Sequence, residues 1–134
     1  MSTPPPPQAG SISWADITVP DASGLRDFYA AVAGWSVTPL SMGDYDDYVM
    51  TLPGTDSPVA GICHRRGSNA VLPPVWMVYI TVADLDASLA ACVAGGGKVW
   101  LTPQRMGETA RYAVIADPAG AVVALYDTGI RPAP

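Results

Sequence analysis

Few residues in this chain have the type and spacing that catalysis or metal binding requires. Asp44, Asp46 and Asp47 resemble the start of a calcium-binding loop, but the glycine and the terminal glutamate of such a loop are missing, so we expect a solvated acidic turn. The single histidine, His64, precedes two arginines at a predicted strand end. This triplet could bind an anion or form an ordinary exposed basic turn. One histidine with no identifiable spacing partner predicts neither a Ser-His-Asp nor a Cys-His arrangement.

The two cysteines indicate neither a disulfide framework nor a zinc site. Cys63 and Cys92 fall in different predicted elements, and there is no CxxC pair or histidine cluster beside them. We expect both to be small buried hydrophobic residues in a reducing compartment. The glycine run 95–97 follows a predicted helix instead of opening one, so it predicts no phosphate-binding helix start.

Composition places the chain among globular proteins. Its 134 residues fit one domain, 49% of them are hydrophobic and 14% are charged, which excludes a disordered solvated chain. The net charge of −5 would be repelled by nucleic acid and by anionic membranes, so we expect neither as a partner. The longest apolar stretch, 75–82, is too short to cross a bilayer. Residues 1–10 contain four consecutive prolines and lack the pattern of a signal peptide, so we expect a disordered tail there and a cytoplasmic protein.

An internal repeat organises the rest of the chain. The segment Ile17-Thr18-Val19-Pro20-Asp21 recurs 63 positions later as Ile80-Thr81-Val82-Ala83-Asp84. A second pair of segments, 59–62 and 122–125, repeats at the same offset, and 31–34 matches 92–95 at an offset of 61. Two copies of one module are therefore predicted, with helices that differ in length by two residues.

Alternation and turn residues predict the elements of each copy. In the first, residues 11–19 alternate, Asp21 or Ser23 can cap a helix, and Gly34 can end it. The predicted strands are 11–19, 35–41, 47–52 and 58–64 in the first copy, and 75–82, 98–101, 109–116 and 121–126 in the second. The second helix starts near Leu85 and ends at the glycine run.

This order resembles a known superfamily. A duplicated βαβββ order with a Thr-Val-x-Asp motif, then Phe28-Tyr29, Ala33-Gly34-Trp35 and a terminal Asp117-Pro118-x-Gly120 turn, looks like the vicinal oxygen chelate superfamily, which includes glyoxalases, bleomycin-resistance proteins and dioxygenases. The resemblance implies an α+β fold in which two modules form one half-open barrel. It implies a single domain at 11–127, with modules at about 11–66 and 75–127, a linker between them and a second tail at 128–134.

The resemblance also locates the metal positions of the family's enzymes. In those enzymes His or Glu ligands come from the first and last strand of each module, and the matching positions here are Trp14, Gly61, Met77 and Ala124. None offers the imidazole nitrogen or carboxylate oxygen that Zn, Mn, Fe or Ni sites use, so we expect no metal cofactor. His64 is three residues beyond Gly61 and is predicted on the opposite strand face.

If those four positions face inward, alternation adds further residues to the same face. The candidate ligand-binding residues are Trp14, Asp16, Gly61, Cys63, Met77, Tyr79, Ala124 and Tyr126. Tyr48, Met50 and Trp100 could join them, depending on register. Asp16 could receive a cationic or hydroxyl group of a ligand, or be an ordinary strand-end hydrogen-bonding residue. No catalytic residue is predicted.

These residues favour a metal-independent protein that binds an apolar or aromatic small molecule between the modules. One alternative is a lyase, hydroxylase or dioxygenase-type enzyme of the same superfamily. Another is a structural or dimerisation domain in which the large side chains fill the cavity. We expect a homodimer, because many members of the superfamily pair.

Overall fold

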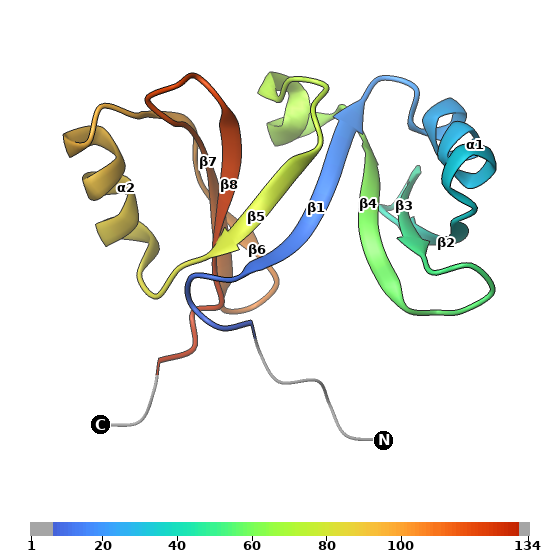
Figure 1. Ribbon diagram of the computed structural model, residues 1–134, viewed down its shortest axis with the longest axis horizontal. Helices are drawn as coiled ribbons and strands as arrows, with labels where there is room; N and C mark the ends of the chain where they lie inside the picture. The colour runs from blue at the N-terminus through green and yellow to red at the C-terminus, as the bar shows by residue number, and fades with distance from the viewer. Residues whose placement is uncertain (1–6, 132–134) are drawn as a thin grey trace. The chain divides into compact units, whose positions relative to one another are not determined.

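The computed structural model describes residues 7–131 and contains eight strands and two α-helices within that range (Figure 1). The elements in chain order are β1 (Ile12–Val19), α1 (Ala22–Ala33), β2 (Ser36–Ser41), β3 (Asp46–Thr51), β4 (Pro58–His64), β5 (Met77–Thr81), α2 (Leu85–Ala94), β6 (Lys98–Met106), β7 (Ala110–Ala116) and β8 (Val122–Asp127), with a short 3-10 helix, Gly67–Val71, between β4 and β5. The predicted order of two βαβββ modules is confirmed. The strand β6 is longer than predicted and the strand β5 is shorter.

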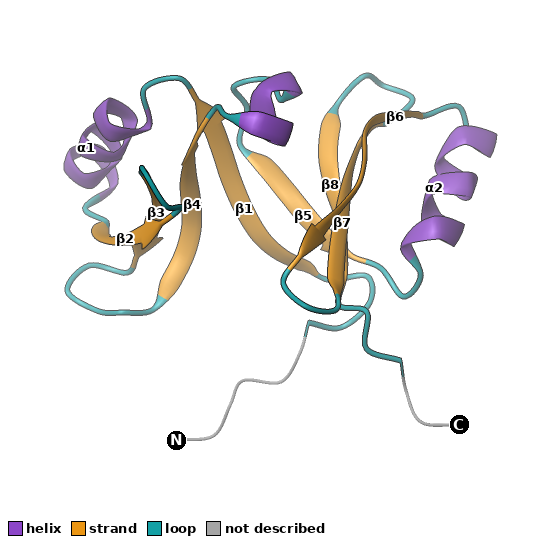
Figure 2. Ribbon diagram, turned by 180° about the vertical axis from the view of Figure 1, so that it is seen from behind, coloured by secondary structure: helices purple, strands orange, loops and turns teal. Residues whose placement is uncertain are grey.

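The chain divides into two compact units. Trp14–Trp76 forms the first module, and Met77 onward forms the second together with the start of the chain through Ser13. The first module has the strand order β2-β3-β4-β1, and the second has the order β5-β8-β7-β6. In each module one parallel strand pair, β1 with β4 or β5 with β8, is extended by antiparallel strands. Figure 2 shows one helix beside each four-stranded group.

The pairing of the strands follows the internal repeat of the sequence. In the first module Asp16 pairs with Gly61, and in the second module Tyr79 pairs with Ala124, so both partners are displaced by 63 positions. The next pairs along the strands keep the same offset: Ile17 with Ile62 corresponds to Ile80 with Leu125, and Thr18 with Cys63 corresponds to Thr81 with Tyr126. The two modules therefore hold equivalent positions at equivalent places.

Each helix is fixed by a carboxylate at its start. The side chain of Asp21 accepts a hydrogen bond from the Gly24 amide at 2.9 Å, and Gly34 ends α1 with a φ of 74°, a left-handed conformation that glycine adopts without strain. The side chain of Asp84 accepts from the Ala87 amide at 3.2 Å at the start of α2. Both caps lie at the repeated strand-to-helix motif.

One face of each strand group packs against the helix of its own module. In the first module this core contains Ile17, Ala22, Tyr48, Met50 and Ile62, and in the second it contains Leu85, Ala113 and Leu125. Because strand side chains alternate, the residues between these core positions lie on the opposite face, which carries no helix. We call that surface the helix-free face of each module.

The segment before β1 belongs to the second module. The Gly10 amide donates to the Thr81 carbonyl at 2.7 Å, and the Thr81 amide donates to the Ser11 carbonyl at 2.9 Å. The expected tails at 1–10 and 128–134 extend into residues 1–6 and 132–134, which are outside the described residues. No helix in the described range combines the length and the apolarity needed to span a membrane.

Candidate functional site

The helix-free face of the first module brings together the four candidate residues from β1 and β4. Asp16 and Gly61 are direct partners across the parallel pair, and Cys63 lies two residues further along β4. A side-chain carbon at position 61 would lie 3.1 Å from the Cβ of Asp16 and 3.5 Å from the ring of Trp14. The Trp14 ring is therefore at van der Waals distance from this position, and the Asp16 side chain approaches it more closely.

Cys63 is surrounded by groups that keep its thiol protonated. Burial raises the pKa of this thiol well above its ordinary range, and the carboxylates of Asp16 and Asp47 add to the shift. Asp47 is buried and its Oδ1 accepts a hydrogen bond from the His64 amide at 2.9 Å. Because the thiolate is the nucleophilic form, Cys63 is not an activated nucleophile in this environment.

Asp47 lies beside Cys63 but was not among the candidate ligand-binding residues predicted from the sequence. The sequence placed it in a solvated acidic turn with Asp44 and Asp46, whereas the side chain is only 5% exposed at the start of β3. The interpretation of the triplet as a solvated turn is therefore wrong for this one residue. The sequence did not determine the residue at which this strand starts. The alternation of buried and exposed side chains therefore could not show that Asp47 faces inward.

The helix-free face of the second module is apolar and aromatic. Met77, Tyr79 and Ala124 are buried, and Tyr126 is half-buried on the same face. Tyr112 on β7 is the direct partner of Tyr126, and its ring centroid lies 6.2 Å from that of Tyr79. The Tyr79 and Tyr112 rings are almost fully buried, so Tyr126 is the ring of this face that keeps a partly exposed surface.

Sequence reasoning missed Tyr112 because its place depends on the register of β7. Alternation alone does not decide which face of β7 turns toward α2, and only the partners Ala113, in the helix-side core, and Tyr126 fix it. The repeat offers no help, since the position 63 residues before Tyr112 holds Val49.

Two residues that the sequence offered as additional lining are elsewhere. Tyr48 and Met50 point to the helix side of the first module and belong to its core, where the Tyr48 hydroxyl is 2.9 Å from the Ser23 hydroxyl. The third, Trp100, is 45% exposed within β6, where the register with β7 shifts. His64 also lies on the helix side, with its ring 5.7 Å from the ring of Tyr45.

The described residues 7–131 contain no group of three or more His, Cys, Asp or Glu side chains arranged to hold a metal ion. Both cysteines are free and half-buried, so they are less buried than predicted from the sequence.

Comparison with known proteins places the chain in a family. The model of the Glyoxalase/Bleomycin resistance protein/Dioxygenase superfamily matches residues 11–125. The chain belongs to this superfamily, and the α+β fold inferred from its repeat is that of the family.

Curated relatives include two proteins of about twice the length. "Putative glyoxylase CFP32" of Mycobacterium tuberculosis is 34% identical over 120 residues, covering 87% of this chain and 45% of the relative. "Anthracycline biosynthesis protein DnrV" of Streptomyces peucetius is 29% identical over 133 residues, covering 90% of this chain and 48% of the relative. The chain spans about half the length of the curated relatives it matches.

Solved structures share the fold at low sequence identity. A methylmalonyl-CoA epimerase from Mycobacterium tuberculosis has a TM-score of 0.53 and 19% identity, covering 96% of this chain and 95% of its own. A Mn(II)-bound glyoxalase from Novosphingobium aromaticivorans has a TM-score of 0.56 and 19% identity, covering 93% of this chain and 41% of its own. At these identities the likeness concerns the fold alone.

Proposed function

We propose that this protein binds an apolar or aromatic small molecule without the help of a metal ion. The observation that carries the proposal is the apolar, aromatic helix-free face of the second module, where half-buried Tyr126 pairs with Tyr112 and the buried Tyr79 and Tyr112 ring centroids lie 6.2 Å apart. Burial of apolar area and ring stacking would provide the binding free energy, and the tyrosine hydroxyls could orient polar groups of the ligand.

The residues at the family's metal positions do not fit a divalent ion. Trp14, Gly61, Met77 and Ala124 supply neither imidazole nor carboxylate. A side-chain carbon at position 61 would also lie 3.1 Å from the Cβ of Asp16, with the Trp14 ring at 3.5 Å, so this position has little room for another ligand side chain. We therefore assign no chemical step to a metal in this chain.

The name of one relative supports a flat aromatic ligand. DnrV is named for anthracycline biosynthesis, and anthracyclines are fused-ring aromatic compounds. Planar rings of that kind match the aromatic face of the second module better than they match an acidic metal site. An anthracycline is therefore a suitable first probe, because its own fluorescence reports stacking against aromatic side chains.

The proposal is tested with apolar variants that each remove one ring. We expect Tyr79→Leu and Tyr112→Leu to weaken binding of the anthracycline about threefold to tenfold, since an aromatic pair is worth about 0.5–1.5 kcal/mol beyond its burial. Phe28→Leu is the matched control, because Phe28 is 53% exposed on α1. Fluorescence titration and calorimetry measure the affinity, and circular dichroism checks the fold. Unchanged affinity in both tyrosine variants would refute the assignment of this face.

Elemental analysis of the purified protein tests the enzyme alternative. A protein that binds without a metal is expected to contain much less than one equivalent of Zn, Mn, Fe or Ni. One equivalent of such a metal that also raises the melting temperature would favour a glyoxalase-like lyase or dioxygenase-type enzyme instead. This alternative is motivated by the relative named as a glyoxylase and by the structural neighbour named as a Mn(II)-bound glyoxalase.

Two further expectations remain predictions. We propose that the chain pairs with a second copy of itself, which light scattering after size-exclusion chromatography would show as twice the mass of 13.9 kDa. The cytoplasmic location also stays a prediction, and fractionation of the source cells would test it.

A further inference from the structure

A cavity of about 280 Å³ lies in the second module, and neither Tyr79 nor Tyr112 is among the residues that line it. Its walls come from the end of β5 and the following loop, from the segment after β8, and from the start of the chain near Pro7. Val82, Ala83 and Ile130 supply apolar wall atoms, and Arg131 supplies a guanidinium. A water occupies about 30 Å³ in the liquid, so the cavity has room for a compound of roughly nine heavy atoms.

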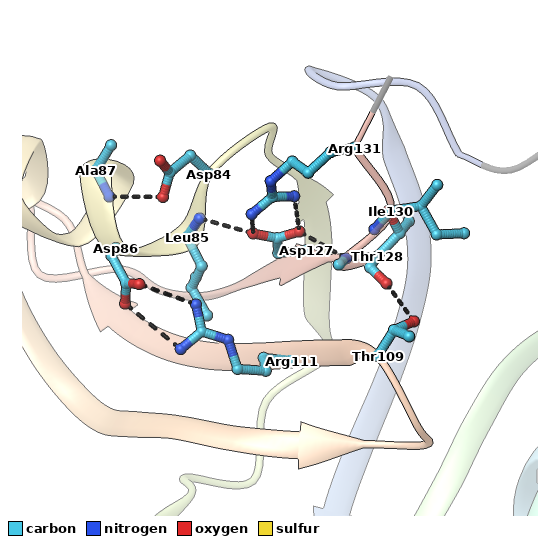
Figure 3. Close-up of polar contacts among 11 residues, drawn as sticks. Asp84, Leu85, Asp86, Ala87, Thr109, Arg111, Asp127, Thr128, Ile130 and Arg131 are labelled. Carbon is cyan, nitrogen blue, oxygen red and sulfur yellow. Dashed lines mark hydrogen bonds and ion pairs between the residues drawn. The ribbon is translucent and has the colours of Figure 1, made fainter. Parts of the chain in front are cut away.

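Arg131 gives this cavity a hydrogen-bond donor that is held in place. Figure 3 shows its guanidinium paired with Asp127 through two bonds, at 2.9 and 3.1 Å. A guanidinium has five N–H donors, and this pair uses two of them. The remaining donors can serve an acceptor atom inside the cavity, while Asp127 restricts the position of the side chain.

The surrounding charges disfavour a charged occupant. The hydrogen bond with Asp127 raises the pKa of Arg131. The nearby negative charges of Asp84 and Asp86 raise it further. Asp86 is itself paired with Arg111 at 3.0 Å. Three carboxylates against two guanidinium groups would repel an anion, and a cation would face the Arg131 guanidinium itself.

The start of α2 does not supply an anion site here either. The Leu85 amide donates to Asp127 at 2.9 Å, and the Ala87 amide donates to Asp84 at 3.2 Å. These backbone donors are engaged by the chain's own carboxylates, so the cavity wall offers the Arg131 guanidinium as its charged donor, beside the hydroxyls of Thr81 and Thr128.

We propose that this cavity is a second ligand site, distinct from the aromatic face, which takes a small uncharged apolar compound carrying one carbonyl or ether oxygen. The apolar walls contact the body of the compound, and Arg131 donates to its oxygen. No metal or cofactor takes part.

The test uses three six-membered-ring probes that differ in charge and have about seven to nine heavy atoms, within the size the cavity admits: cyclohexanone, cyclohexanecarboxylate and cyclohexylammonium. Each is titrated into the full-length 15N-labelled protein while the amide resonances of Val82, Ala83 and Ile130 are followed. We expect cyclohexanone to cause saturable shifts at these amides in the millimolar range typical of so small a compound, and to bind about tenfold more tightly than either charged probe.

Variants connect the signal to the cavity. Ile130→Trp should fill it and abolish the saturable shifts, and Ala83→Leu should reduce them from another wall. Val93→Trp is the matched control, because Val93 is 61% exposed on α2 and does not line the cavity. Tyr79→Leu should leave cyclohexanone binding unchanged, which separates this site from the aromatic face.

Several results would overturn the proposal. These are no saturable shift in the unmodified protein, equal or tighter binding of the carboxylate, or retained binding in both Ile130→Trp and Ala83→Leu. If cyclohexanone binding were lost in Tyr79→Leu as well, the probe would be reporting on the aromatic face and the second site would be rejected.

Discussion

Replacing Asp127 by asparagine should destabilise the second module by more than its position at the end of β8 suggests. The Asp127 side chain is 2% exposed and accepts hydrogen bonds from the amides of Leu85 and Gly129, at 2.9 and 2.8 Å, as well as from Arg131. Asparagine keeps the shape and one acceptor oxygen, but it removes the negative charge and presents an NH2 group to donors. The change therefore isolates the role of charge in linking β8, the start of α2 and the segment after β8.

The size of the effect follows from these contacts. The Leu85 and Gly129 amides donate to different oxygens of Asp127, and asparagine keeps one of them. One amide bond therefore becomes neutral and loses about 1 kcal/mol, while the other loses its acceptor at a cost of about 1–3 kcal/mol. The Arg131 side chain is half-exposed, and its pair adds at most about 1 kcal/mol. We expect Asp127→Asn to lower the free energy of unfolding by about 2–5 kcal/mol and the melting temperature by about 6–20 °C.

The pH dependence provides a second readout. The hydrogen bond from Arg131, followed by those from the Gly129 and Leu85 amides, holds the pKa of Asp127 well below its ordinary range. A carboxyl whose pKa is lower in the folded state stabilises the protein above its unfolded pKa of about 3.9, and this contribution is lost as pH falls below that value. The stability difference between the unmodified protein and Asp127→Asn should therefore be constant above about pH 5 and shrink by about 1.4 kcal/mol per pH unit below the unfolded pKa.

Urea unfolding followed by circular dichroism, from pH 7 down to pH 3, measures both quantities. Asp117→Asn is the matched control, because Asp117 also accepts from two backbone amides, those of Ala119 and Ala121, but in an exposed turn. It should cost less than about 1 kcal/mol. A loss below about 0.5 kcal/mol at position 127, or a difference that does not shrink at low pH, would refute the reasoning.

Three further predictions concern other parts of the chain. Gly61→Val should destabilise by about 1–3 kcal/mol in urea because its side chain meets the Trp14 ring, and Trp14→Ala in the same chain should relieve part of that cost; full additivity of the two variants would contradict the contact. In a Cys92→Ser chain, Cys63 should react with a chromogenic disulfide at pH 8 more than about tenfold slower when folded than in urea, because burial raises its pKa; equal rates would show that the thiol is accessible and ionised. Asp21→Ala should cost about 1 kcal/mol by removing the cap of α1, and Asp21→Asn should recover most of it; failure of asparagine to restore stability would argue against capping.

The parts of the fold that the sequence predicted are those set by local chemistry. The helix α1 begins after Asp21 and ends at Gly34, where a cap and a left-handed glycine were expected. The repeat offset of 63 positions also predicted that the first and last strands of each module hold equivalent places, and the pairing of Asp16 with Gly61 and of Tyr79 with Ala124 agrees. Nearby residues decide these features, so a single sequence contains them.

The features that the sequence did not predict depend on contacts between distant residues. Tyr48 and Met50 face α1 because β3 pairs with β4 in a particular register, including a shift after Met50. The network around Asp127 joins residues up to 42 positions apart. Alternation states only that neighbouring side chains point to opposite faces, and the partner strand decides which face is which.

Because the two modules share one strand register, equivalent positions can carry different side chains on the same backbone. Equivalent backbone positions hold Asp16 and Tyr79, Gly61 and Ala124, and Cys63 and Tyr126. The first module has a carboxylate at Asp16 where the second module has the aromatic ring of Tyr79. The backbone hydrogen bonds between the paired strands follow the same register in both modules. Chimaeras that exchange residues across the 63-position offset can therefore separate the chemistry of a surface from the stability of the strands beneath it, except at Gly61, where an added Cβ would lie 3.1 Å from the Cβ of Asp16.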